Sequence, residues 1–246
     1  MVLMTLGLLN GCSKGAFLTP STTDVETSRT ATPFEARFVV GESLEGRPLE
    51  VATLGSGDEV VLIVATIHGS EPAGTPLCQQ LIVELRERPD LLDGRRVIVM
   101  PVANPDGLLA SSRGNRRGVD LNRNFPAANR INSARFGHEA LSEPEARALY
   151  RLVDTQQPDR IVSIHQPLAC VDYDGPAEEL AQRMSEASGL IVRKLGAQPG
   201  SLGAYVGNTL GLPIVTFELP RDAHLQSRTE LWENYGEALL QAIAYD

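Results

Sequence analysis

The sequence predicts an α/β fold built on a mainly parallel mixed sheet flanked by helices. Four apolar runs have the length and composition of strands buried on both faces, at residues 60–67, 97–102, 161–164 and 214–217. Segments with helical spacing separate or follow these runs. Strands that alternate with helices indicate parallel pairing, because a parallel neighbour is reached through a crossover connection.

The elements before and after the first strand follow from turn signals and periodicity. Residues 36–57 contain two β-rich segments around Gly46, which predicts a hairpin. After the first apolar run, Leu77, Leu81 and Leu85 recur at helical spacing and predict a helix with one buried face.

Three features place the later helices. Ser142 and Glu145, with an early Pro144, form the pattern of a capping box and predict a helix start. A helix is expected over residues 176–188, ending at Gly189. The last helix is predicted from Leu231, Tyr235, Leu239 and Ile243, which share one helical face.

Composition and charge describe a globular chain of 246 residues with 42% apolar residues. Its formal net charge is −9 and its pI about 5.0, which argues against a protein that binds nucleic acid. Several arginines nevertheless crowd into residues 111–126. This contrast predicts a small anionic substrate.

The N-terminus resembles that of a bacterial lipoprotein. A short apolar run ends in Leu9-Asn10-Gly11-Cys12, so residues 1–12 are expected to be a signal peptide with a lipobox that leaves Cys12 lipidated. Residues 13–35 are rich in Ser, Thr and Pro and predict a linker, which leaves 36–246 as one catalytic domain. We therefore expect a periplasmic or cell-surface, membrane-anchored protein. No Lys or Arg precedes the apolar run, so the alternative is an accidental run and a cytoplasmic enzyme.

Polar residues stand at the ends of the four apolar runs: His68, Asn104, His165 and Glu218. In open α/β sheets, ligands bind beyond the carboxyl ends of the strands. His68 and Glu71 lie within one tight turn, and with His165 they would form a His₂Glu set that suits one zinc ion with an open position. The alternative is that His68 hydrogen-bonds within its loop and Glu71 favours a helix N-terminus.

Several sequence motifs resemble those of a known family, and this resemblance favours the zinc site. HGSEPAG, NPDG, GVDLNRNFP and FELP occur in the order found in zinc carboxypeptidases of the carboxypeptidase A-like family, and the similarity covers about residues 37–220. GESLEGRPL and LSEPEARAL also resemble that family. Two further stretches, SIHQPLACVDYDGPAEELA and PGSLGAYVGNTLGLPIVTFELP, look like its murein peptide amidase branch, which cleaves the γ-D-glutamyl–diaminopimelate bond.

The resemblance implies a role for each matching residue. His68, Glu71 and His165 would hold one Zn²⁺. Among the remaining matches, Asn122 and Arg123 would bind the free carboxylate of the substrate, for which the planar guanidinium is well suited. Arg113 would stabilise the oxyanion. Glu218 would act as general base and acid.

Other positions are less sharply defined. Arg116 or Arg117 could take the place of Arg113. Tyr205 is expected to bind substrate by lining the pocket, although it stands only 13 residues before Glu218. Asp172 and Asp174 are candidates to bind the ammonium group of diaminopimelate, and the alternative places them in a solvated loop.

Structural roles are expected for four residues, which are Cys78, Cys170, Asp120 and Asn104. Cys78 and Cys170 could form a disulfide or remain two inert buried thiols, and the second option is favoured because their spacing shows no framework. Asp120 and Asn104 are expected to shape loops or to orient metal ligands.

Three functions are compatible with these features. The first is a zinc amidase that acts on murein peptides. The second is a general zinc carboxypeptidase or an N-acyl amino acid deacylase acting on another small substrate with a free carboxylate. The third is an inactive wall-binding lipoprotein, which the complete set of ligands and Glu218 disfavours.

Overall fold

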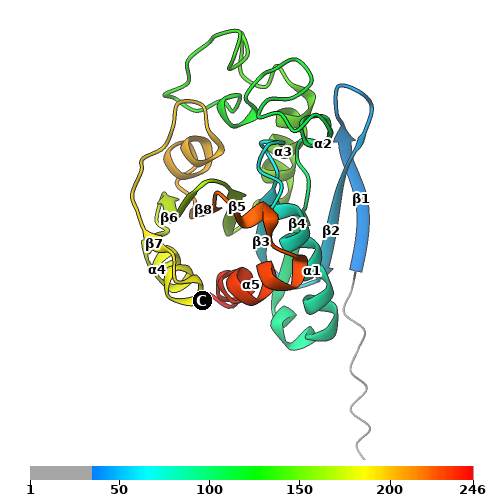
Figure 1. The fold of residues 1–246 in the computed structure, drawn as a ribbon, viewed down its shortest axis with the longest axis vertical. Helices are drawn as coiled ribbons and strands as arrows, with labels where there is room; N and C mark the ends of the chain where they lie inside the picture. Colours follow the sequence, from blue (N-terminus) through cyan, green and yellow to red (C-terminus); the bar gives the residue numbers. More distant parts are fainter. Residues whose placement is uncertain (1–34, 246) are drawn as a thin grey trace, which may run out of the picture. The chain divides into compact units, whose positions relative to one another are not determined.

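The computed structural model describes residues 35–245, which form an eight-stranded mixed sheet (Figure 1). The strand order across the sheet is β1-β2-β4-β3-β5-β8-β6-β7. The strands are β1 Glu35–Glu42, β2 Pro48–Gly55, β3 Glu59–Ala65, β4 Arg95–Met100, β5 Arg160–His165, β6 Leu168–Asp174, β7 Ile191–Val192 and β8 Ile214–Pro220. The predicted signal peptide, residues 1–12, and all of the predicted linker 13–35 except Glu35 lie outside the described residues. Glu35 is the first residue of strand β1.

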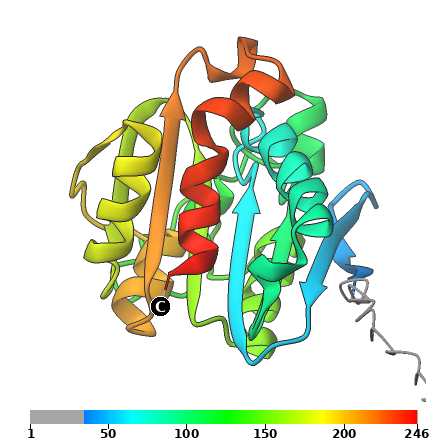
Figure 2. The same ribbon diagram turned by 90° about the horizontal axis from the view of Figure 1, so that it is seen from below.

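Helices cover both faces of this sheet. They are α1 Gly74–Glu87, α2 Pro105–Leu109, α3 Pro144–Gln156, α4 Glu178–Ser188 and α5 Arg228–Ala244. Figure 2 shows α1, α4 and α5 side by side over one face, and α3 packs on the other. Short helical turns occupy Pro89–Leu92, Leu121–Arg123, Ala204–Thr209 and Ala223–Leu225. Within residues 35–245, no helix combines the length and apolar character needed to cross a membrane.

The four predicted strands form the parallel centre of the sheet. β4, β3, β5 and β8 pair in parallel, with Val61 opposite Val97 and Ile164 opposite Phe217. β1, β2 and β6 pair antiparallel, which makes the sheet mixed as expected. β6 and β7 were not predicted as strands. The fold class predicted from the alternation of strands and helices is confirmed.

The core consists of two layers separated by the sheet. Val61, Ile63 and Val215 face α1, α4 and α5, whereas Leu62 and Ile161 face α3. Successive side chains of a strand point to opposite faces, so an apolar run without alternation fills both layers. This explains why the central strands were recognisable from composition.

Chain turns confirm two predictions and correct one. Gly46 has a positive φ of 75° in the β1–β2 hairpin, and Gly189 closes α4 in the left-handed conformation. The capping box predicted at Ser142 is wrong: Glu143 is the N-cap of α3, and Pro144 takes the first helical position without a side-chain cap. A capping box is instead formed by Ser227 at the start of α5.

The two cysteines of the described residues are free thiols. Cys78 lies on α1 and Cys170 on β6, and both are fully buried. The expectation of inert buried thiols is therefore confirmed. Burial raises the pKa of the Cys78 thiol, so that it stays protonated and packs as a small apolar group.

Candidate active site

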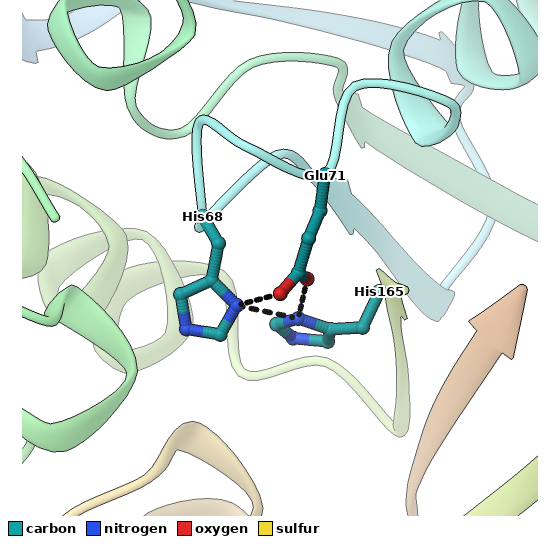
Figure 3. A group of neighbouring side chains, drawn as sticks. All are labelled: His68, Glu71 and His165. Atoms are coloured by element: carbon teal, nitrogen blue, oxygen red, sulfur yellow. Dashed lines mark hydrogen bonds and ion pairs between the residues drawn. The ribbon is translucent and has the colours of Figure 1, made fainter. Parts of the chain in front are cut away.

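Two histidines and one glutamate converge at the carboxyl ends of two parallel strands (Figure 3). His68 and Glu71 lie in the turn between β3 and α1, and His165 is the last residue of β5. The Nδ1 atoms of both histidines lie 2.9 Å from different carboxylate oxygens of Glu71. The two Nδ1 atoms are 3.2 Å apart. The fold therefore brings together, in one cluster, three residues from two distant segments of the sequence.

The outer nitrogen of each imidazole is held by a hydrogen-bonding partner. His68 Nε2 lies 3.0 Å from Asp120 Oδ1, and His165 Nε2 lies 2.9 Å from Ser163 Oγ. Ser163 is two residues before His165 on β5, so both side chains lie on the same face of the strand. These contacts turn both Nδ1 atoms toward Glu71, as the outer shell of a metal site does.

Glu71 is anchored and ionised. The backbone N–H of Gln166 donates to Glu71 Oε2 at 3.2 Å. Burial acts to raise the pKa of Glu71, but hydrogen bonds from His165 and His68 outweigh it and hold this pKa well below its usual range. The same opposition holds at Asp120, where the bond from His68 keeps the pKa low despite burial.

This donor set fits zinc. The ligand atoms of His68, Glu71 and His165 lie within 4.8 Å of one another and are buried. Two imidazole nitrogens and a carboxylate are one of the ligand sets that catalytic zinc sites use, with a further position left open. The open side of the cluster faces a cavity, where a substrate can approach.

The cavity beside the cluster has a volume of about 270 Å³. Its wall contains the three metal donors and most other predicted site residues. These are Arg113, Asn122, Arg123, Asp172, Asp174 and Glu218, joined by Gln166, Leu168, Ser201, Gly203 and Thr216. Residues from strands β5, β6 and β8 and from the loops around 68–71, 113–123 and 195–203 thus meet in one space.

Glu218 lies next to the metal donors because of strand register. On β8 it pairs with His165 of β5, and it is 9% exposed. Its Oε2 accepts a hydrogen bond from the backbone N–H of Leu168 at 3.3 Å. Burial is the largest influence on the pKa of Glu218 and raises it, against the opposing charge of His165. A carboxylate in this position can exchange protons with a group in the cavity.

The structure settles which arginine faces the cluster. Arg113 donates from Nη1 to Glu71 Oε1 at 3.0 Å and from Nε to Asp120 Oδ2 at 2.9 Å. Arg116 pairs with Glu45 instead, and Arg117 pairs with Glu143. Of the three candidates, only Arg113 lines the cavity.

Asn122 and Arg123 lie in the short turn that follows Asp120. Asn122 Oδ1 accepts a hydrogen bond from the N–H of Leu202 at 2.8 Å, which joins two loops of the cavity wall. The Arg123 guanidinium donates to the Asn122 carbonyl at 2.6 Å. No carboxylate in residues 35–245 forms an ion pair with Arg123, so its remaining donors are available to an anion.

Asp172 and Asp174 lie on strand β6, so the solvated loop is ruled out. Asp172 pairs with Thr216 and Asp174 with Ile214 of β8, and both carboxylates are buried at the cavity wall. Burial and the charge of Asp172 raise the pKa of Asp174 to about 6. Lys194 Nζ approaches Asp174 at 3.9 Å.

Tyr205 is not brought to the cavity, contrary to the expectation. It is 5% exposed, and its ring centroid lies 6.3 Å from that of Phe125 and 5.4 Å from that of Tyr150. The helical turn Ala204–Thr209 directs Tyr205 into the core layer beside α3. Aromatic packing rather than substrate contact therefore explains this residue.

Two supporting residues were not predicted. Gln166 accepts a bond from the N–H of Ala73 at 3.1 Å and donates to the carbonyl of Pro220 at 3.2 Å, which ties together the loops after β3, β5 and β8. Ser163 orients His165. The sequence signal for this role was that Ser163 lies two residues before His165 on the same strand.

Comparison with known families and proteins agrees with this geometry. Residues 25–175 match the family model of the zinc carboxypeptidases. Murein peptide amidase A of Escherichia coli K12 is 37% identical over 202 residues, which span 75% of this chain and 79% of that protein. The enzyme of the same name from Vibrio campbellii is 33% identical, over 75% of this chain and 77% of its own.

Solved structures are similar over a larger share of the chain. The crystal structure of a murein-tripeptide amidase from Escherichia coli O157 has a TM-score of 0.65 and 31% identity, covering 86% of this chain and 92% of that one. Carboxypeptidase A of Helicoverpa armigera has a TM-score of 0.72 at 21% identity, covering 86% of this chain and 69% of the other. The second likeness concerns the fold alone.

We predict that Asp120→Asn weakens zinc binding by about 10- to 100-fold, because an amide loses the charge that fixes the His68 ring and Arg113. The zinc dissociation constant, measured by competition with a chromogenic chelator, tests this. Asp93→Asn, at an exposed position after α1, is the matched control and should bind zinc as the parent does. Equal affinities in the two variants would contradict the role given to Asp120.

Proposed function

The chain belongs to the zinc carboxypeptidase family, and from this membership we propose that it hydrolyses the γ-D-glutamyl–diaminopimelate bond of murein peptides. Membership makes the chain a hydrolase. The specific substrate is supported by relatives named as murein peptide and murein-tripeptide amidases. The observation that carries the proposal is one cavity that joins the metal donors and Glu218 to both anion-binding and cation-binding side chains.

The leaving residue has complementary partners in this cavity. Diaminopimelate carries a carboxylate beside the scissile amide and an amino acid group at its far end. Arg123 and Asn122 would bind the near carboxylate, since a guanidinium donates two parallel hydrogen bonds to such a group. Asp172 and Asp174 would attract the distal ammonium group from the wall formed by β6.

The chain's own residues would then move one proton and stabilise one charge. When bound by His68, Glu71 and His165, zinc would lower the pKa of water and polarise the scissile carbonyl. Glu218 would accept a proton from the attacking water as oxygen adds to the carbonyl carbon. Arg113 would donate to the negative oxygen that develops. Glu218 would return the proton to the amide nitrogen as the C–N bond breaks, releasing diaminopimelate and a peptide with a free γ-carboxylate.

We expect Glu218→Gln to lower the release of diaminopimelate from L-Ala-γ-D-Glu-diaminopimelate by at least about 10²- to 10⁴-fold, because the amide cannot carry the proton. The measurement is free diaminopimelate formed by residues 35–246 with and without a zinc chelator. Zinc content of the variant should equal that of the parent, because Glu218 is not among the metal donors.

The outcomes separate the family activity from the substrate. Chelator-sensitive release that disappears in Glu218→Gln supports the amidase. If zinc-loaded parent protein releases no diaminopimelate, the murein assignment is contradicted. Ordinary peptides and N-acyl amino acids would then be assayed. Failure of the folded protein to bind zinc would favour a binding protein without activity.

The acidic wall generates a separate prediction. Asp174→Asn should raise KM for the diaminopimelate tripeptide by about tenfold and leave kcat nearly unchanged, because one charged hydrogen bond to the ammonium group is lost. A substrate ending in norleucine lacks that ammonium group and serves as the control, with a KM that should not rise. An equal rise for both substrates would mean that Asp174 shapes the wall and does not bind the cation.

We further propose that lipidation of Cys12 anchors the enzyme at the membrane, which would bring it to murein in the periplasm or at the cell surface. The lipobox-like residues before Cys12 support this, and the alternative is a cytoplasmic enzyme. In a Gram-negative host, incorporation of labelled palmitate should occur in the parent and be lost in Cys12→Ser. Unlabelled parent protein recovered in the soluble cytoplasmic fraction would overturn the anchor.

A further inference from the structure

A second cavity adjoins the first on the far side of Arg113 and Arg123. It has a volume of about 490 Å³ and is lined by Arg113, Asp120, Arg123, Arg135, Phe136, Gln198 and Pro199. Arg113, Arg123 and Gln198 belong to both cavities. Glu218 and the two β6 carboxylates line only the first. Glu218 and the acidic wall therefore belong to the first cavity, and the second contains neither.

The second cavity is rich in positive charge, of which the described residues neutralise only that of Arg113, through Glu71 and Asp120. Asp120 is its one acidic lining residue, and both Asp120 oxygens are engaged, by His68 and by Arg113. No carboxylate within residues 35–245 pairs with Arg123 or with Arg135. Burial is the largest influence on the pKa of Arg123 and lowers it. The charge of Asp120 acts to raise this pKa, and the charges of Arg113 and Arg135 lower it further. Three guanidinium groups thus lie near enough to repel one another.

Arg135 is an exposed side chain on a braced loop. Its carbonyl accepts a hydrogen bond from the backbone N–H of Asp120 at 2.8 Å, which ties the loop to the residue that holds His68. The next carbonyl, of Phe136, accepts from Asn124 at 2.9 Å and from Arg130 at 3.0 Å. The Arg135 guanidinium carbon lies 5.8 Å from the centroid of the Phe136 ring. These contacts keep the guanidinium near the cavity without an internal counterion.

We infer that this cavity binds the free α-carboxylate of the γ-linked glutamyl residue, with Arg135 as the residue that selects it. A γ-linked glutamyl residue is joined through its side-chain carboxyl, so its α-carboxylate remains free on the acyl side of the scissile bond. In an ordinary α-linked peptide the backbone continues at that place without a charge. This inference rests on the proposed murein-peptide activity, and it adds that the enzyme selects γ-linked over α-linked glutamyl residues.

The position of Arg113 supports placing the leaving residue in the first cavity and the acyl residue in the second. Arg113 contacts Glu71 of the metal cluster and lines both cavities, so a carbonyl at the cluster lies beside it. The leaving residue extends toward Asp172 and Asp174 in the first cavity. The acyl residue must extend the other way, which brings its α-carboxylate to Arg135, while Phe136 and Pro199 offer apolar contact to its methylene groups.

Two substrates and one substitution test the inference. The first substrate is L-Ala-γ-D-Glu-diaminopimelate, and the second carries an α-carboxamide in place of the glutamyl α-carboxylate. Arg135→Gln should lower kcat/KM for the acid by about tenfold, mainly through KM, because a hydrogen bond between charged groups is lost. It should leave the carboxamide substrate unchanged. The parent should prefer the acid by a similar factor.

Arg116→Gln is the matched control, because Arg116 is an exposed arginine that pairs with Glu45 and lines neither cavity. Equal parent activity on both substrates, or an equal effect of Arg135→Gln on both, would overturn the role of Arg135 and leave the murein amidase standing. Zinc-loaded parent that cleaves neither substrate would instead overturn the proposed function, and the linkage selection with it.

Discussion

The register of three parallel strands is the constraint on which the rest of the site depends. Ala65 pairs with Ile164, and His165 pairs with Glu218, so the ends of β3, β5 and β8 form one rim. Because side chains alternate between faces, a slip of one residue in β8 would direct Glu218 to the opposite layer. The same slip would exchange the β8 residues between the two packed core layers, so both layers oppose it. Core packing therefore positions the carboxylate of Glu218 at this rim.

Loops complete what the strands begin, and Asp120 joins them. One of its oxygens meets His68, the other meets Arg113, and its backbone N–H binds the carbonyl of Arg135. A single buried residue thus contacts His68, Arg113 and the loop around the second cavity. The hydrogen bond from His68 holds the pKa of Asp120 well below its usual range despite burial, so this carboxylate is ionised at neutral pH.

The sequence was sufficient for the central strands and for the cluster of His68, Glu71 and His165, but not for the cavity wall. In this chain the buried parallel strands are apolar throughout and are followed by polar residues, and both features can be read from the sequence alone. Strand β6 escaped detection because Asp172 and Asp174 occupy the positions that face the cavity, so its pattern resembles a polar loop. Tyr205 was misplaced for the opposite reason, because whether an aromatic side chain faces substrate or core depends on the rotation of its helical turn, which no local pattern reports.

The two cavities together argue for a substrate with charges of both signs in a set order. The chain as a whole carries −9, yet the loop side of the site presents Arg113, Arg123 and Arg135, while β6 presents two carboxylates. Arg113 is already paired with Glu71 and Asp120, whereas Arg123 and Arg135 form no ion pair with a carboxylate in residues 35–245. A ligand that places anions on both sides of the scissile bond and a cation at its far end would offer partners to these two arginines and to the β6 carboxylates. A neutral peptide would leave the half-buried Arg123 without an anionic partner, which is costly. Discrimination against such peptides therefore follows from the same charges that would bind the preferred one.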